Sequence, residues 1–192
     1  MKYSIILLLS LCGIIASCGD DKENPKPSTY LRTDLPDHSY KKITNSSKYT
    51  YELSNLYNVK EVSVRGERTD HHEISLGKLD GLLYLNYYPT PNRDSLIRYI
   101  NLSNDKVDEH QVKASKIVDK TFIFPKKKVY CTFFELQGNV ATNFQFYITD
   151  SSTRFVRGEL LMNCRPNYDS LRPVLNYIQK DLEHMIETFE WK

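Results

Sequence analysis

The apolar periodicity near the end of the chain constrains the fold more than any other feature of the sequence. Apolar residues recur there at spacings of three and four over about five turns, which predicts one amphipathic helix. Ser170 is suited to cap its start, and Pro173 is tolerated in a first turn. The stripe consists of Leu171, Val174, Leu175, Ile178, Leu182, Met185, Ile186 and Phe189. The opposite face, which we expect to be solvated, carries Lys180, Asp181, Glu183, His184 and Glu187.

Two predicted strands precede this helix and are suited to pack against its stripe. Phe144, Phe146 and Ile148 alternate with more polar residues, which is the period of a half-buried strand. Residues 150–153 favour a turn that closes a hairpin. The second strand places one set of residues on a single face: Val156, Gly158, Leu160, Met162 and Cys164.

The remaining pattern predicts an α+β domain with an antiparallel sheet and two main helices. Thr90 and Pro91 indicate the start of the first helix, while residues 104–114 fit either more helix or a loop. The order of the elements is similar to that of the PsbP-like α-β-α sandwich. Strands are predicted at residues 49–53, 59–65, 82–88, 116–124 and 128–136.

The N-terminus has the pattern of a bacterial lipoprotein signal peptide. Lys2 precedes an apolar stretch that ends in Ile15-Ala16-Ser17-Cys18, a sequence typical of a lipobox. We therefore predict cleavage after residue 17 and lipidation of Cys18; the alternatives are an ordinary signal peptide or an uncleaved anchor. Residues 18–28 are expected to form a polar, disordered tether, and residues 29–192 a single globular α+β domain.

Charge and cysteine content limit the classes of function. The net charge is +2, and without Lys2 the 25 basic and 24 acidic residues that remain give +1. This balance favours neither nucleic-acid binding nor electrostatic attraction to a membrane, so the lipid would be the membrane attachment. For Cys131 and Cys164 we expect two buried thiols in strands, with a disulfide between them as the alternative.

No pattern of catalytic or metal-binding residues stands out. Residues 70–73, Asp-His-His-Glu, are expected to form a solvated loop rather than a metal site, because adjacent histidines on a strand point to opposite faces. Ser170 and His184 would lie ~20 Å apart on one helix at 1.5 Å per residue, which rules out a hydrolytic triad. We predict no cofactor and no metal.

Several residues are candidates for partner contacts. Arg157 could present its guanidinium to a partner carboxylate, or form an ion pair across the strands. Tyr84, Tyr87 and Tyr88 could form a partner surface, a glycan platform, or a layer under a helix. Trp191 could be a partner anchor, or fold back onto the edge of the core.

In chain order the sequence contains Tyr30, Arg32, Asp34-Leu35-Pro36, His38, Tyr40, His110, Gln145-Phe146, Thr149-Asp150-Ser151, Phe155, Arg157-Gly158, Pro166-Asn167, Asp169-Ser170, Pro173, Ile186-Glu187-Thr188 and Trp191-Lys192. These residues resemble the gliding-motility lipoprotein family GldD of Bacteroidetes, and the resemblance is densest after Gly138. His is expected by this resemblance where Arg154 and Tyr84 stand, and Cys near Ser47, so no His- or Cys-based site is transferred.

The resemblance implies an envelope lipoprotein required by the gliding and type IX secretion machinery. We expect a non-enzymatic protein that contacts other envelope lipoproteins or secretion and motility components. It would be held by its lipid, at the outer membrane and on the periplasmic face rather than the cell surface. The alternative is a lipoprotein that binds or hydrolyses glycan or peptidoglycan.

Overall fold

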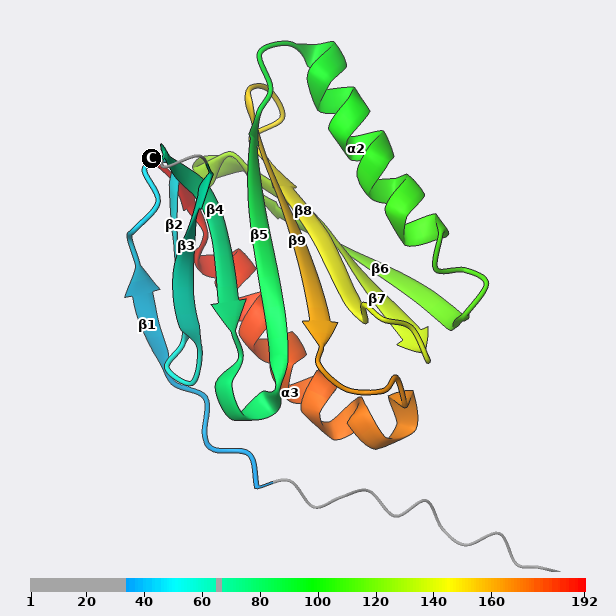
Figure 1. The fold of residues 1–192 in the computed structure, drawn as a ribbon. Helices are drawn as coiled ribbons and strands as arrows, with labels where there is room; N and C mark the ends of the chain where they lie inside the picture. Colours follow the sequence, from blue (N-terminus) through cyan, green and yellow to red (C-terminus); the bar gives the residue numbers. More distant parts are fainter. Residues whose placement is uncertain (1–33, 65–66) are drawn as a thin grey trace, which may run out of the picture.

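The computed structural model describes residues 34–64 and 67–192, which form a three-layered α+β structure (Figure 1). A seven-stranded antiparallel sheet, in the order β3-β4-β5-β9-β8-β7-β6, is the central layer. Helix α2 lies on one face, and helix α3 lies on the other beside a three-stranded sheet, β1-β2-β10. The predicted fold class is confirmed. The elements are β1 (Tyr40–Ile43), β2 (Tyr49–Ser54), β3 (Asn58–Val64), β4 (Glu67–Ser75), η1 (Gly77–Leu79), β5 (Gly81–Pro89), α2 (Arg93–Asp108), β6 (Ala114–Phe124), η2 (Pro125–Lys127), β7 (Val129–Gly138), β8 (Phe144–Thr149), β9 (Arg154–Met162), α3 (Tyr168–Thr188) and β10 (Glu190–Trp191).

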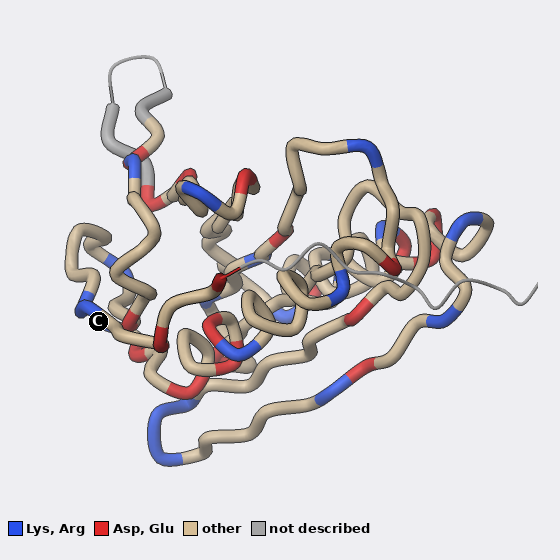
Figure 2. The backbone as a smooth tube through the Cα atoms, turned by 90° about the horizontal axis from the view of Figure 1, so that it is seen from below, with Lys and Arg blue, Asp and Glu red and all other residues tan. Residues whose placement is uncertain are grey.

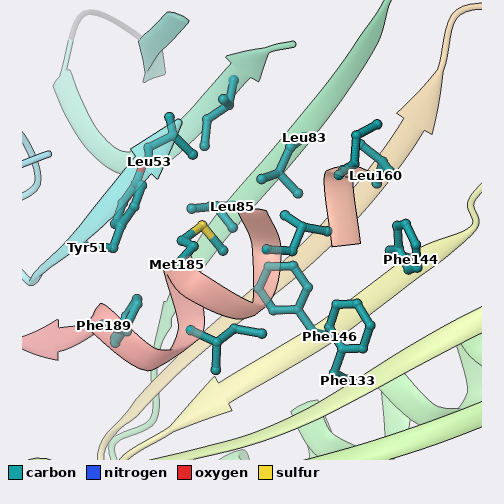
Figure 3. Close-up of a cluster of buried hydrophobic side chains, with 14 of the residues drawn as sticks. Tyr51, Leu53, Leu83, Leu85, Phe133, Phe144, Phe146, Leu160, Met185 and Phe189 are labelled. Carbon is teal, nitrogen blue, oxygen red and sulfur yellow. The ribbon is translucent and has the colours of Figure 1, made fainter. Parts of the chain in front are cut away.

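Helix α3 buries the predicted stripe against the sheet. Met185 and the ring of Phe189 meet side chains from β5, β7, β8 and β9 in one apolar cluster (Figure 3). The start of the helix differs from the expectation, because the side chain of Asn167 accepts a hydrogen bond from the amide of Ser170 and is therefore the cap. Pro173 lies inside the helix and not in its first turn.

Helix α2 also begins later than predicted. Asn92 caps it by accepting a 2.8 Å hydrogen bond from the amide of Ser95. Thr90 is buried and instead donates to the carbonyl of Ser152, in the β8–β9 turn. Both helices thus start at an asparagine, whose side-chain oxygen satisfies an amide that has no partner in the first turn.

The hairpin of β8 and β9 forms as predicted. Asp150 closes it by accepting hydrogen bonds from the amides of residues 152–154. Gly158 faces Phe146 across the pair, and a Cβ atom at this position would lie 2.0 Å from the ring. Only glycine leaves room for this ring. Strand β9 ends at Met162, before Cys164.

The loop expected at residues 70–73 is part of strand β4. His72 is buried on the face that carries α3, and its Nδ1 lies 2.8 Å from the hydroxyl of Tyr51 in β2. Tyr49, also in β2, stacks on Phe189 with ring centroids 5.2 Å apart. These contacts place the small sheet next to α3, so His72 of β4 lies in the interior because β2 covers it.

Candidate functional site

The most unusual environment among the described residues is that of Asp181 in α3. Its side chain is buried, although the sequence predicts it on the solvated face of the helix. A buried carboxylate is unfavourable unless hydrogen-bond donors replace water. His38 Nδ1 lies 2.7 Å from Asp181 Oδ1, and the Tyr57 hydroxyl donates to Oδ2 over 2.6 Å. We name Asp181, His38, Tyr40, Tyr57 and Tyr177 the Asp181 cluster.

Stacked rings join the N-terminal part of the described chain to α3. The His38 ring stacks on Tyr177 at 4.2 Å, and the Tyr40 ring stacks on His184 at 3.6 Å. His184 Nε2 in turn lies 2.8 Å from a carboxylate oxygen of Glu52 in β2. Residues before and within β1 are therefore attached to the helix by side chains as well as by the β1–β2 ladder.

The three phenols of the Asp181 cluster are held in their protonated form. Burial raises the pKa of Tyr57, and the hydrogen bond to Asp181 raises it further. Burial, followed by the charge of Asp181, raises the pKa of Tyr40 to about 12. The pKa of Tyr177 is raised by burial and then by Asp181 and Asp37. Each hydroxyl therefore stays protonated at neutral pH. The Tyr57 hydroxyl donates to Asp181, whereas the Tyr177 hydroxyl is buried without a hydrogen-bond partner among the described residues.

A histidine bonded to a carboxylate is also part of hydrolytic triads, which need a nucleophile beside the second imidazole nitrogen. In the described part of the chain, His38 contacts Asp181, Tyr40 and Tyr177. None of these is a nucleophile of such a triad. The arrangement is suited to fix the N-terminal residues on α3. Across residues 34–64 and 67–192, no group of three or more His, Cys, Asp or Glu side chains is placed to hold a metal ion.

A second polar group lies on the opposite face of the large sheet, which carries α2. Arg157 Nη2 donates to Gln145 Oε1 over 2.9 Å, and its Nη1 lies 3.1 Å from Glu159. Gln145 donates to Thr142, whose hydroxyl lies 3.1 Å from His110 Nε2. We name Arg157, Glu159, Gln145, Thr142 and His110 the Arg157 row. Within this row, Gln145 and Glu159 hold the guanidinium of Arg157 from two sides.

The Arg157 row borders sheet surface that no described helix covers. Helix α2 packs on β8 and β9, and Figure 1 shows β3, β4 and β5 to one side of it. The side chain of Arg157 is 18% exposed and that of Glu159 is 27% exposed. Tyr84 of β5 pairs with Glu159 and is half-buried. Arg157 and Tyr84, both predicted as contact residues, thus lie on adjacent strands of one face.

The other two predicted tyrosines do not join this surface. Tyr87 points to the α3 side, where its ring lies 6.3 Å from that of Tyr49. Tyr88 shares the face of Tyr84 but stacks on Tyr99 of α2 at 4.8 Å. Because successive side chains of a strand alternate between faces, the three cannot form one patch.

Trp191 lies across the sheet from Arg157, in strand β10. Its ring contacts Phe189 at 4.8 Å, and its Nε1 donates to the carbonyl of Lys128 over 2.9 Å. The guanidinium of Arg154 sits 5.7 Å from the ring centroid. The side chain is half-buried, so it covers the edge of the core while leaving part of the indole accessible.

The two cysteines of the domain have different environments. Cys131 is buried in β7, and this burial raises the pKa of its thiol. Cys164 is exposed between β9 and α3, so its predicted buried position in a strand is wrong. Both are free thiols, and the alternative of a disulfide is not formed here. Cys18 and the predicted signal and tether residues 1–28 lie outside the described residues.

Comparison with known families identifies the chain. Residues 20–191 match the family described as gliding motility lipoprotein GldD. The chain belongs to the GldD family. The match includes both the Asp181 cluster and the Arg157 row, and it places the protein among lipid-anchored proteins of the cell envelope.

Other comparisons add little about this GldD-family protein. No curated protein matches it. The solution structure of cyanobacterial PsbP (CyanoP) from Synechocystis sp. PCC 6803 overlaps with a TM-score of 0.43 at 10% sequence identity, over 88% of this chain and 99% of that chain. Within the described ranges, no helix has the length and apolar character needed to span a membrane. Basic and acidic residues are distributed around the whole molecule (Figure 2).

Proposed function

We propose that this GldD-family protein is a non-enzymatic envelope lipoprotein that supports gliding motility and type IX secretion by binding other proteins. Its lipid would be carried by Cys18, at the periplasmic face of the outer membrane. Its partners would be other envelope lipoproteins or components of the secretion and motility machinery. Family membership supports the gliding context. The Arg157 row supports a role in protein binding.

The guanidinium of Arg157 is suited to a partner contact because its orientation is fixed before binding. Gln145 engages Nη2 and Glu159 engages Nη1, while a guanidinium offers five N–H donors. Its other N–H groups are of the type that binds a carboxylate or main-chain carbonyl of a partner. Tyr84 supplies an aromatic surface on the next strand, and Arg and Tyr are both enriched among residues that dominate binding energy.

Crosslinking in the native envelope, followed by purification of the tagged protein, tests this proposal. Arg157→Ala is expected to reduce capture of the wild-type partners by about tenfold or more, since loss of a dominant contact costs ~2 kcal/mol. Arg93→Ala is the matched control, because it removes an exposed arginine from the start of α2. Equal capture by wild type and Arg157→Ala, with both folded, would contradict the assignment of this surface.

A further inference from the structure

A groove of about 850 Å³ opens at the end of the molecule where the described chain begins. One wall is formed by residues 34–36, and the others by the β2–β3 turn and by η1. Figure 1 shows these segments together at the end of the sheet nearest the N-terminus. Most of the lining is apolar: Leu35, Pro36, Leu56, Leu76 and Leu79. Leu76 and Leu79 form a buried floor, while Leu56 is 37% exposed at the rim.

We propose that this groove binds the segment of the same chain that directly precedes it, with Tyr30 and Leu31 as the apolar side chains that fill it. Leu31 is three residues before Asp34, so its Cα lies within ~11 Å of the Asp34 Cα in any conformation. Asp34 and Leu35 are themselves part of the wall. Connectivity therefore brings this segment to the groove without a separate binding partner.

The sequence around these two residues matches such a role. Between Cys18 and Asp34, Tyr30 and Leu31 are the large apolar side chains, and residues 19–29 are polar residues, glycine and proline. Docking would remove both side chains and the exposed part of Leu56 from water, which is favourable in proportion to the apolar area buried. The volume also lies within the ~300–1,000 Å³ of sites that hold small apolar ligands, and an aromatic and an aliphatic side chain fit such a space.

The consequence for function rests on the proposed lipid anchor at Cys18. With Tyr30 and Leu31 docked, the free tether ends near residue 29 instead of residue 33. Four residues fewer shorten the greatest reach of the domain from the membrane by ~14 Å. Docking and release of one short segment would therefore set how far the Arg157 row extends from the bilayer.

Amide hydrogen exchange on the full chain tests the inference. The Asp80 amide, at the end of η1, donates to Gly77 over 3.1 Å and reports on the groove. The Lys128 amide, at the end of η2, makes the same bond to Pro125 over 3.1 Å and is the internal reference. Both residues have a φ of 50°. We expect Tyr30→Ser combined with Leu31→Ser to accelerate exchange at Asp80 by at least about tenfold and to leave Lys128 unchanged.

Ile97→Ser combined with Leu102→Ser is the matched control, because it removes two exposed apolar side chains from α2. It is expected to leave exchange at Asp80 unchanged. Unchanged exchange at Asp80 in the Tyr30 and Leu31 variant would overturn the inference, as would equal acceleration at Asp80 and Lys128. The measurement requires no membrane and no partner. Unchanged exchange at Asp80 would therefore leave the proposed function intact. Conversely, a failure of the partner-capture experiment would leave the docking of Tyr30 and Leu31 untouched.

Discussion

Replacement of Tyr57 by Phe isolates the contribution of one hydrogen bond to the Asp181 cluster. Tyr57 is fully buried, and its hydroxyl donates to Asp181 Oδ2 over 2.6 Å. The substitution removes this oxygen and keeps the ring, so packing changes little. Asp181 Oδ2 is then left in the interior without its donor.

The expected cost follows from the charge of the acceptor. A hydrogen bond to a charged group contributes ~1.5–3 kcal/mol, and a neutral one ~0.5–1.5 kcal/mol. Tyr51→Phe provides the neutral comparison, because Tyr51 is equally buried and its hydroxyl lies 2.8 Å from His72 Nδ1. Tyr57→Phe should therefore reduce the free energy of unfolding by about 1 kcal/mol more than Tyr51→Phe does.

Urea unfolding at neutral pH measures both costs, and an unchanged m-value shows that the unfolded states are comparable. Combining Tyr57→Phe with Asp181→Asn completes a double-mutant cycle, which should give a coupling energy of ~1 kcal/mol or more. Equal costs for the two tyrosines, together with no coupling to Asp181, would refute the view that Asp181 is a buried charge stabilised by this donor.

Two further predictions concern the large sheet. Gly158→Ala should lower the free energy of unfolding by ~1–3 kcal/mol, because the added Cβ would overlap the buried Phe146 ring. In Gly81→Ala the added Cβ would lie 3.0 Å from the sulfur of the flexible Met162 side chain. Thermal melts of both variants should therefore show a smaller loss of stability for Gly81→Ala. Burial lowers the pKa of His72 below its ordinary 6.5. Below about pH 6.5 the unfolded chain therefore binds a proton at His72 that the folded chain does not, and the free energy of unfolding should fall as the pH drops. His72→Gln should flatten this dependence between pH 7 and 5, and an unchanged slope would contradict the assignment.

Periodicity predicted the elements well and their surroundings poorly. The stripe of α3 is visible in the sequence because its apolar side chains recur with the period of a helix. Asp181 follows Tyr177 by four residues and Ile178 by three, so it borders this stripe. Its burial depends on which segment covers the helix there, and His38 and Tyr57 come from distant parts of the chain.

Helix-capping residues also cannot be predicted from local sequence where two good caps lie close together. Thr90 and Asn92 are both good caps, as are Asn167 and Ser170, and tertiary contacts of the flanking residues decide between them. Periodicity does not indicate strand β4, because its polar residues face β2, a strand that is not its neighbour in any ladder. Arg157 alternates along β9 with the buried residues Val156 and Gly158, but its contact with Gln145 depends on the pairing of β8 with β9.

The attachment of His38 and Tyr40 to α3 determines the path of mechanical load through the molecule. A pull applied upstream of residue 34 travels along the backbone to these two side chains and from them into the longest helix of the described chain. That helix continues through Phe189 into β10, which pairs with β2. Tension is thus shared between α3, the apolar core beneath it and the small sheet, and the four-residue strand β1 does not resist it alone.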